Sequence, residues 1–426
     1  MKSLIGSQKF SWAILLGKFG STQIIVQLFG FCSGLLLVRI LSKDVYALYT
    51  IANTMLGTMS VLSDSGVGSG SMALAGRMWN DKGKLSQVVK TALHLRHYFA
   101  LAVLFCLSPV LFIWLNSHGA GTGEATIATL IIALTLYLQT GNALLGVVPR
   151  ILLQTDRLQL VEFLTSLVRL VAVCTAAFIF LNLTTALIVG AFASAFQWVL
   201  LLRVTKNDFQ QSATIDTGLK SEILKIVARQ APNSVYYCIQ SQVIFWLLGI
   251  FGNPAAIADA GALGRLAVVF TIAGNILATM VMPRFSRCHS PELLWKRFHQ
   301  VLGLLISALS ILVLAASLFP ELMLWLLGQK YQNLENEILL MVAAQSLNCL
   351  LTAVSSLNIG KGWIVSPWLT ISSGFLSYYL LFLLIGASSL KQVLLVGILA
   401  SMIALVINYS EAIFSMRRMQ SEQGKS

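Results

Sequence analysis

Uncharged polar residues recur at helical spacing inside several long apolar segments of this chain. Members of each set are three, four or seven residues apart, so each set lies on one face of a helix. Such faces either line a polar cavity or hydrogen-bond to neighbouring helices. The candidates for a cavity lining are Gln23, Gln27, Asn53, Gln139, Asn142, Tyr237, Gln240, Gln345 and Asn348.

Four charged residues lie in or beside the same segments. Arg169 lies within an apolar stretch, on one helix face with Glu162. A guanidinium there either pairs with an acid on another helix or binds an anion, and both readings place it inside a bundle. Asp64 precedes a Gly/Ser-rich run, so we expect it to cap or hinge a helix end or to take part in ion coupling. Glu162 is a second candidate for that coupling, and Arg265 is a second candidate cation.

The elements that must position these residues are membrane-spanning helices. Hydrophobic residues make up 57% of the 426 residues and charged residues 11%, and the mean hydropathy is +0.81. A soluble protein of this length cannot bury so much apolar surface. The sequence therefore predicts an all-α polytopic membrane protein with about 12 transmembrane helices. The expected spans are near 17–38, 46–64, 93–115, 125–148, 160–181, 184–202, 232–251, 262–282, 299–318, 338–358, 366–386 and 392–412.

Basic residues indicate the orientation of the spans. About 23 of the 29 Lys and Arg residues fall in the two tails and the even-numbered connections. The positive-inside rule then places both termini in the cytoplasm. Basic loops beside anionic headgroups explain the formal charge of +13 without a nucleic-acid partner.

A weak internal repeat suggests two halves. Asp44, Ala47 and Leu48 recur as Asp259, Ala262 and Leu263, after the first and the seventh expected spans. An even number of spans in each half gives both halves the same orientation, so we expect two six-helix bundles related by a pseudo-twofold axis along the membrane normal. The expected domains are 1–203 (N-terminal bundle), 204–229 (cytoplasmic linker) and 230–426 (C-terminal bundle).

The distribution of polar residues favours a cavity over simple helix-to-helix contacts. Polar stripes occur in the first, second, fourth, seventh and tenth expected spans, whereas the third and ninth are almost wholly apolar. Amide and glycine stripes also join helices in membranes, so a single stripe would not decide between the two readings. Five stripes in matching positions of two halves favour a central polar cavity.

Metal and redox chemistry find no support in the sequence. The six cysteines are scattered without a CxxC pair, and they read as small core residues. His94 and His97 share a helix face, but no cysteine or acid completes a metal site beside them. We expect no metal, no cofactor and no enzymatic activity.

Several short motifs follow one another in a recognisable order. They are Arg39–Tyr49 (RILSKDVYALY), Leu62–Gly66 (LSDSG), Asp259–Ala267 (DAGALGRLA), Met282–Ser286 (MPRFS) and Leu324–Tyr331 (LWLLGQKY). This order resembles the Wzx-type polysaccharide flippases of the multidrug/oligosaccharidyl-lipid/polysaccharide exporter superfamily. The chain departs from the usual first motif at Ala47, where a glycine is common, and it lacks the two extra C-terminal helices of the lipid II flippase branch.

The resemblance implies transport of an undecaprenyl-pyrophosphate-linked oligosaccharide, such as an O-antigen repeat unit of lipopolysaccharide, across the bacterial inner membrane by alternating access. The amide residues would then bind the glycan, while Arg169 and Arg265 would bind the pyrophosphate. The implied partners are the lipid-linked substrate, membrane lipids, and the polysaccharide polymerase and chain-length machinery.

Three alternatives stay open. A cation-coupled multidrug exporter of the same superfamily usually needs a carboxylate in its first span, and this first span has none. A membrane glycan polymerase or ligase would need a sizeable outer loop, whereas the outer loops here are short. A scaffold of an envelope assembly would leave the polar stripes without a purpose.

Overall fold

In the computed structural model, every secondary-structure element of the described residues is a helix. The structure describes residues 22–78, 81–152, 154–206, 214–251, 253–277, 281, 285, 291–361, 363 and 366–423. Within these ranges, ten helices are long and apolar enough to cross a membrane, and one bent helix pair passes the same test together. The expected all-α, multi-pass membrane fold is confirmed.

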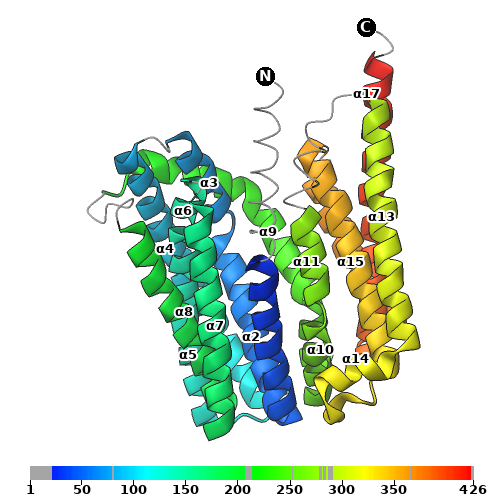
Figure 1. The fold of residues 1–426 in the computed structure, drawn as a ribbon. Coiled ribbons are helices and arrows are strands. Elements are labelled where there is room, and N and C mark those ends of the chain that lie inside the picture. The colour runs from blue at the N-terminus through cyan, green and yellow to red at the C-terminus, as the bar shows by residue number, and fades with distance from the viewer. Residues whose placement is uncertain are drawn as a thin grey trace, which may run out of the picture. The chain divides into compact units, whose positions relative to one another are not determined.

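The chain divides into two compact units, the first of which ends at Gln242. Its α2 packs against α4, α4 against α5, α5 against α8, and α8 against α7 (Figure 1). Its helices are Thr22–Ile40, α2 (Lys43–Asp64), α3 (Val67–Arg77), α4 (Lys82–Ser117), α5 (Thr122–Leu145), α6 (Val147–Ile151), α7 (Thr155–Ile179), α8 (Leu183–Thr205) and most of α9 (Thr217–Phe251).

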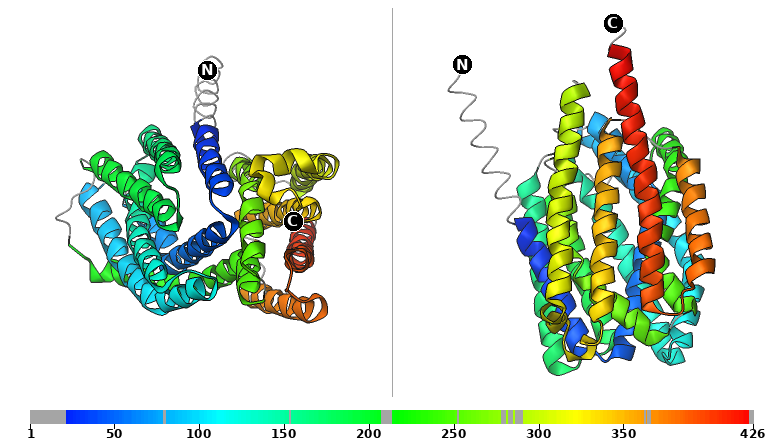
Figure 2. Two further views of the ribbon diagram at one scale, coloured as in Figure 1. Left: turned by 90° about the horizontal axis from the view of Figure 1, so that it is seen from below. Right: turned by 90° about the vertical axis from the view of Figure 1, so that its right-hand side faces the viewer.

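The second unit begins at Val243. In the end-on view, α13, α15 and α17 stand side by side (Figure 2), and α15 and α17 make the most extensive contact. Its further elements are α10 (Pro254–Arg265), α11 (Val268–Ile276), α13 (Pro291–Leu318), α14 (Pro320–Leu327), the 3-10 turn η2 (Gln329–Tyr331), α15 (Glu335–Lys361), α16 (Pro367–Ile385) and α17 (Leu390–Gln423).

Two of the expected spans are irregular helices. The expected span 262–282 begins within a bent pair in which α10 and the following helix meet at 46°. The expected span 232–251 lies in α9, where only Gln242–Phe251 qualifies as a short apolar helix. The other ten expected spans each overlap one helix of spanning length.

The start of α9 is part of the first unit and does not form a free linker. Leu219, Ile223 and Val227 are buried in a cluster with residues of α3, α4 and α6. The Thr91 hydroxyl of α4 accepts a hydrogen bond of 3.2 Å from the Asp216 amide. The boundary between the units therefore falls at 242/243, later than the linker expected at 204–229.

The close approach of α5 and α8 depends on a glycine. A Cβ atom built on Gly141 would lie 1.8 Å from the indole ring of Trp198. That ring is itself stacked on Tyr137, with 5.8 Å between the ring centroids. Only a residue without a side chain fits at position 141, and this contact fixes the spacing of two helices that line the site described next.

Candidate functional site

A polar cavity of about 420 Å³ lies inside the first unit, between α2, α5, α6, α7 and α8. It combines amides, hydroxyls, two arginines and one acid in a helical bundle that is otherwise apolar. Its polar and charged lining residues include Asn53, Ser60, Thr135, Gln139, Asn142, Arg150, Glu162, Thr165, Arg169, Ser194 and Gln197. The cavity brings together five residues selected from the sequence, namely Asn53, Gln139, Asn142, Glu162 and Arg169.

One face of α7 supplies the charges. Glu162, Thr165 and Arg169 are three and four residues apart and all line the cavity. The half-buried Arg169 makes no hydrogen bond or ion pair with any residue that the structure describes. The Thr165 hydroxyl is buried without a hydrogen-bond partner among the same residues. This face therefore presents a guanidinium that a ligand can bind, beside a hydroxyl that is itself buried.

The amides of α2 and α5 are used in different ways. Asn142 Nδ2 donates to the Ser194 carbonyl at 2.9 Å and to Gln197 Oε1 at 3.2 Å, which ties α5 to α8. Its Oδ1 is buried without a partner among the described residues. Asn53 Nδ2 donates to the Tyr49 carbonyl of its own helix at 2.8 Å. Asn142 thus combines both readings of a polar stripe, because it joins two helices and lines the cavity.

The first helix contacts the acid of the cavity. Gln23 Nε2 donates to Glu162 Oε2 at 2.6 Å, and the rings of Phe29 and Phe163 lie 5.7 Å apart. Gln27, the other candidate of this helix, is not among the residues that line the cavity. The helix Thr22–Ile40 therefore packs beside α7, and Gln23 occupies one carboxylate oxygen of Glu162.

The candidates Gln240, Arg265, Gln345 and Asn348 are not among the residues that line this cavity. Asn348 Oδ1 accepts a hydrogen bond of 3.1 Å from Ser401, which joins α15 to α17. Arg265 lies at the end of α10, beside the 46° bend, and is engaged by other residues. Gln240 and Gln345 are half-buried. The side chain of Tyr237 lies outside the described residues, so its role stays a prediction.

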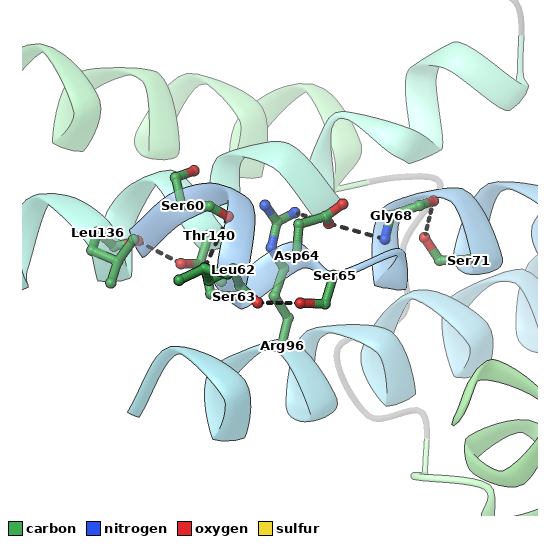
Figure 3. Close-up of polar contacts among 10 residues, drawn as sticks. All are labelled: Ser60, Leu62, Ser63, Asp64, Ser65, Gly68, Ser71, Arg96, Leu136 and Thr140. Atoms are coloured by element: carbon green, nitrogen blue, oxygen red, sulfur yellow. Dashed lines mark hydrogen bonds and ion pairs between the residues drawn. The ribbon is translucent and has the colours of Figure 1, made fainter. Parts of the chain in front are cut away.

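Asp64 ends α2 and holds a sharp break before α3 (Figure 3). Its Oδ1 accepts from the Gly68 amide at 3.0 Å and lies 3.2 Å from Nη1 of Arg96 on α4. The chain turns at Gly66, whose φ of 98° suits glycine. Sequence reasoning treated the third span as apolar and missed Arg96, although a charged residue inside the expected span 93–115 could have drawn attention to it. The carboxylate is committed to a helix cap and an ion pair.

A family model described as "Polysaccharide biosynthesis protein" matches residues 36–336. The chain belongs to the polysaccharide biosynthesis protein family. No curated protein matches the sequence.

Solved structures show where the fold of this family member recurs. An inward-facing MATE family transporter of the MOP superfamily has a TM-score of 0.72 at 13% identity, covering 93% of this chain and 96% of that one. An outward-facing transporter of the same description has a TM-score of 0.68 at 13% identity, with 94% of both chains covered. A MOP superfamily transporter from Pyrococcus furiosus, described as having a binding pocket of reverse polarity, has a TM-score of 0.66 at 13% identity, with 94% of both chains covered. This polysaccharide biosynthesis protein therefore has the fold of MOP superfamily transporters.

Chemical labelling tests whether the cavity is hydrated. The substitutions Asn53→Cys and Gln139→Cys are made in a variant without the six native cysteines. Each new cysteine is expected to react in membrane vesicles with a small hydrophilic thiol reagent, because both positions line the polar cavity. Cysteine at Val103 is the control, since its neighbours Leu101 and Phe105 are exposed on the apolar surface of α4. Equal labelling at all three positions would contradict a hydrated cavity.

Proposed function

We propose that this protein moves an undecaprenyl-pyrophosphate-linked oligosaccharide across the bacterial inner membrane by alternating access. The observation that carries the proposal is the guanidinium of Arg169, which lines a polar cavity in a transporter fold and pairs with no residue that the structure describes. In this proposal the termini are cytoplasmic, the chain is a transporter and not an enzyme, and the released repeat unit passes to polymerase and chain-length proteins.

The chemistry of the cavity suits a lipid-linked glycan. A sugar offers many neutral hydroxyls, and the cavity lining includes the amides of Asn53 and Gln139, which can bind them. A pyrophosphate requires cations, and an arginine can bind two of its oxygens at once. Arg150 adds a second cation to the lining. With two arginines against Glu162, the charge of the cavity favours an anionic ligand.

The alternative is a cation-coupled multidrug exporter, which the MATE-like fold favours. An organic cation would need an accessible carboxylate. The acid that lines the cavity is Glu162, which already accepts a hydrogen bond from Gln23, and two arginines share the lining with it. This electrostatic balance disfavours the alternative.

Reconstituted vesicles separate the two functions. Purified protein in liposomes is expected to move a fluorescent undecaprenyl-pyrophosphate oligosaccharide between leaflets, so that an impermeant quencher reaches the whole labelled pool and not only its outer-leaflet fraction. Ethidium, as a cationic drug, is expected to show no protein-dependent flux. Flux of ethidium without movement of the lipid would establish the multidrug reading and remove the proposal.

A further inference from the structure

A second cavity lies on the first unit, at the far end of the α7–α8 hairpin from Arg150. It has a volume of about 630 Å³ and is lined by residues between Leu167 and Phe180 and between Thr185 and Phe192. We call it the α7–α8 groove. Ten of its twelve lining residues are apolar and two are threonines. Thr175 donates its hydroxyl to the Val171 carbonyl at 2.9 Å, and the Thr185 hydroxyl is used in the cap of α8. Both hydroxyl groups of the lining therefore already donate a hydrogen bond within the protein, and the rest of the groove surface suits a hydrocarbon ligand.

The groove and the polar cavity share the same two helices. On α7, Arg169 lines the cavity, whereas Val168 and Ala172 line the groove. Along the axis of α7, the cavity runs from Leu158 to Arg169 and the groove starts at Leu167, so the two meet at the level of the guanidinium.

Small residues occur in the lining of both spaces. Ala172 lies on the groove side, and Ala186 and Gly190 of α8 lie on the cavity side. No atom lies within 4 Å of a Cβ built on Gly190. These short side chains leave room beside α7 and α8 at the level where the cavity and the groove overlap.

We propose that the α7–α8 groove holds the hydrocarbon tail of the same lipid whose pyrophosphate binds at Arg169. This inference rests on the proposed function. An amphiphile with an anionic head and a long apolar tail needs one polar and one apolar compartment that adjoin, and α7 separates the two here. The stretch from Leu167 to Ile179 rises about 18 Å along a helix, somewhat more than half of a hydrocarbon core of about 30 Å.

The groove positions the lipid tail but adds no hydrophobic driving force to its binding. A tail in the bilayer already has apolar surroundings, so its transfer to the groove gains only packing. Its function is to hold the tail beside the cavity while the head group is bound, which restricts the lipid to the orientation in which its pyrophosphate reaches Arg169.

Filling the groove tests the inference. The double variant Ala172→Phe/Ala176→Phe places two rings in the groove and changes no residue of the polar cavity. Ala102→Phe is the matched control, because Ala102 is exposed on α4. The probes are the undecaprenyl-linked oligosaccharide, followed in liposomes, and two probes without a tail, namely the oligosaccharide pyrophosphate and inorganic pyrophosphate, followed by calorimetry.

The filled variant is expected to move the lipid roughly tenfold more slowly, while it binds the two probes without a tail as the unmodified protein does. The Ala102→Phe control is expected to match the unmodified protein throughout. An unchanged rate for the lipid, or an equal loss of binding for the probes without a tail, overturns the inference and leaves the proposed function standing. Failure of the unmodified protein to move the lipid removes the proposed function itself.

Discussion

Arg169→Ala is expected to abolish movement of the lipid-linked oligosaccharide while the protein accumulates at its normal level. The guanidinium lines a polar cavity and pairs with no described acid, so its removal strands no buried carboxylate among the residues that the structure describes. Loss of a buried, charge-assisted contact to the pyrophosphate costs about 2 kcal/mol or more, which is roughly 30-fold or more in affinity. Complementation of a flippase-deficient strain, together with the protein level in membranes, measures both parts of this prediction.

Arg169→Lys is the graded control. It keeps the positive charge but loses the planar fork that binds two oxygens, so partial rescue is expected. Poor accumulation of the alanine variant would show instead that Arg169 has a structural partner in the folded protein. Normal accumulation with normal transport would exclude any contact of Arg169 with the substrate.

The helices could be predicted from the sequence because their causes are local. Hydropathy and helical spacing depend only on neighbouring residues, so ten expected spans overlap helices of spanning length and the stripes of α2 and α5 meet in one cavity. The partner of each amide could not be predicted in the same way. Asn142 and Asn348 both bond to another helix, and only Asn142 also lines the described cavity.

Two features of the structure depend on tertiary contacts. The segment expected as a cytoplasmic linker contains the buried residues Leu219 and Ile223. Their side chains are buried only when α3, α4 and α6 are packed together. The single charge of Arg96 barely lowers the averaged hydropathy of a long apolar helix. Its partner Asp64 lies 32 residues earlier in the chain. Charge pairs of this kind become visible only when the helices are packed.

Asp64→Ala is expected to lower the free energy of unfolding by about 3 kcal/mol. The Arg96 side chain is only 7% exposed and would keep its charge without a counter-ion. The Gly68 amide at the start of α3 would lose its acceptor as well. The Asp64 side chain is 34% exposed, which keeps the expected loss at the lower end for a buried pair. Thermal unfolding of the detergent-solubilised protein measures the change.

The double variant Asp64→Ala/Arg96→Met decides between the two roles that Asp64 can have. It removes both charges, so it is expected to recover most of the stability that the single variant loses, because an apolar pair can replace a buried ion pair. If the pair only fixes the break between α2 and α3, the recovered protein also transports the lipid. If Asp64 binds a coupling ion, the double variant is stable but inactive, since no carboxylate is left to take up the ion at this position. A double variant no more stable than Asp64→Ala would contradict the ion pair as the source of the effect.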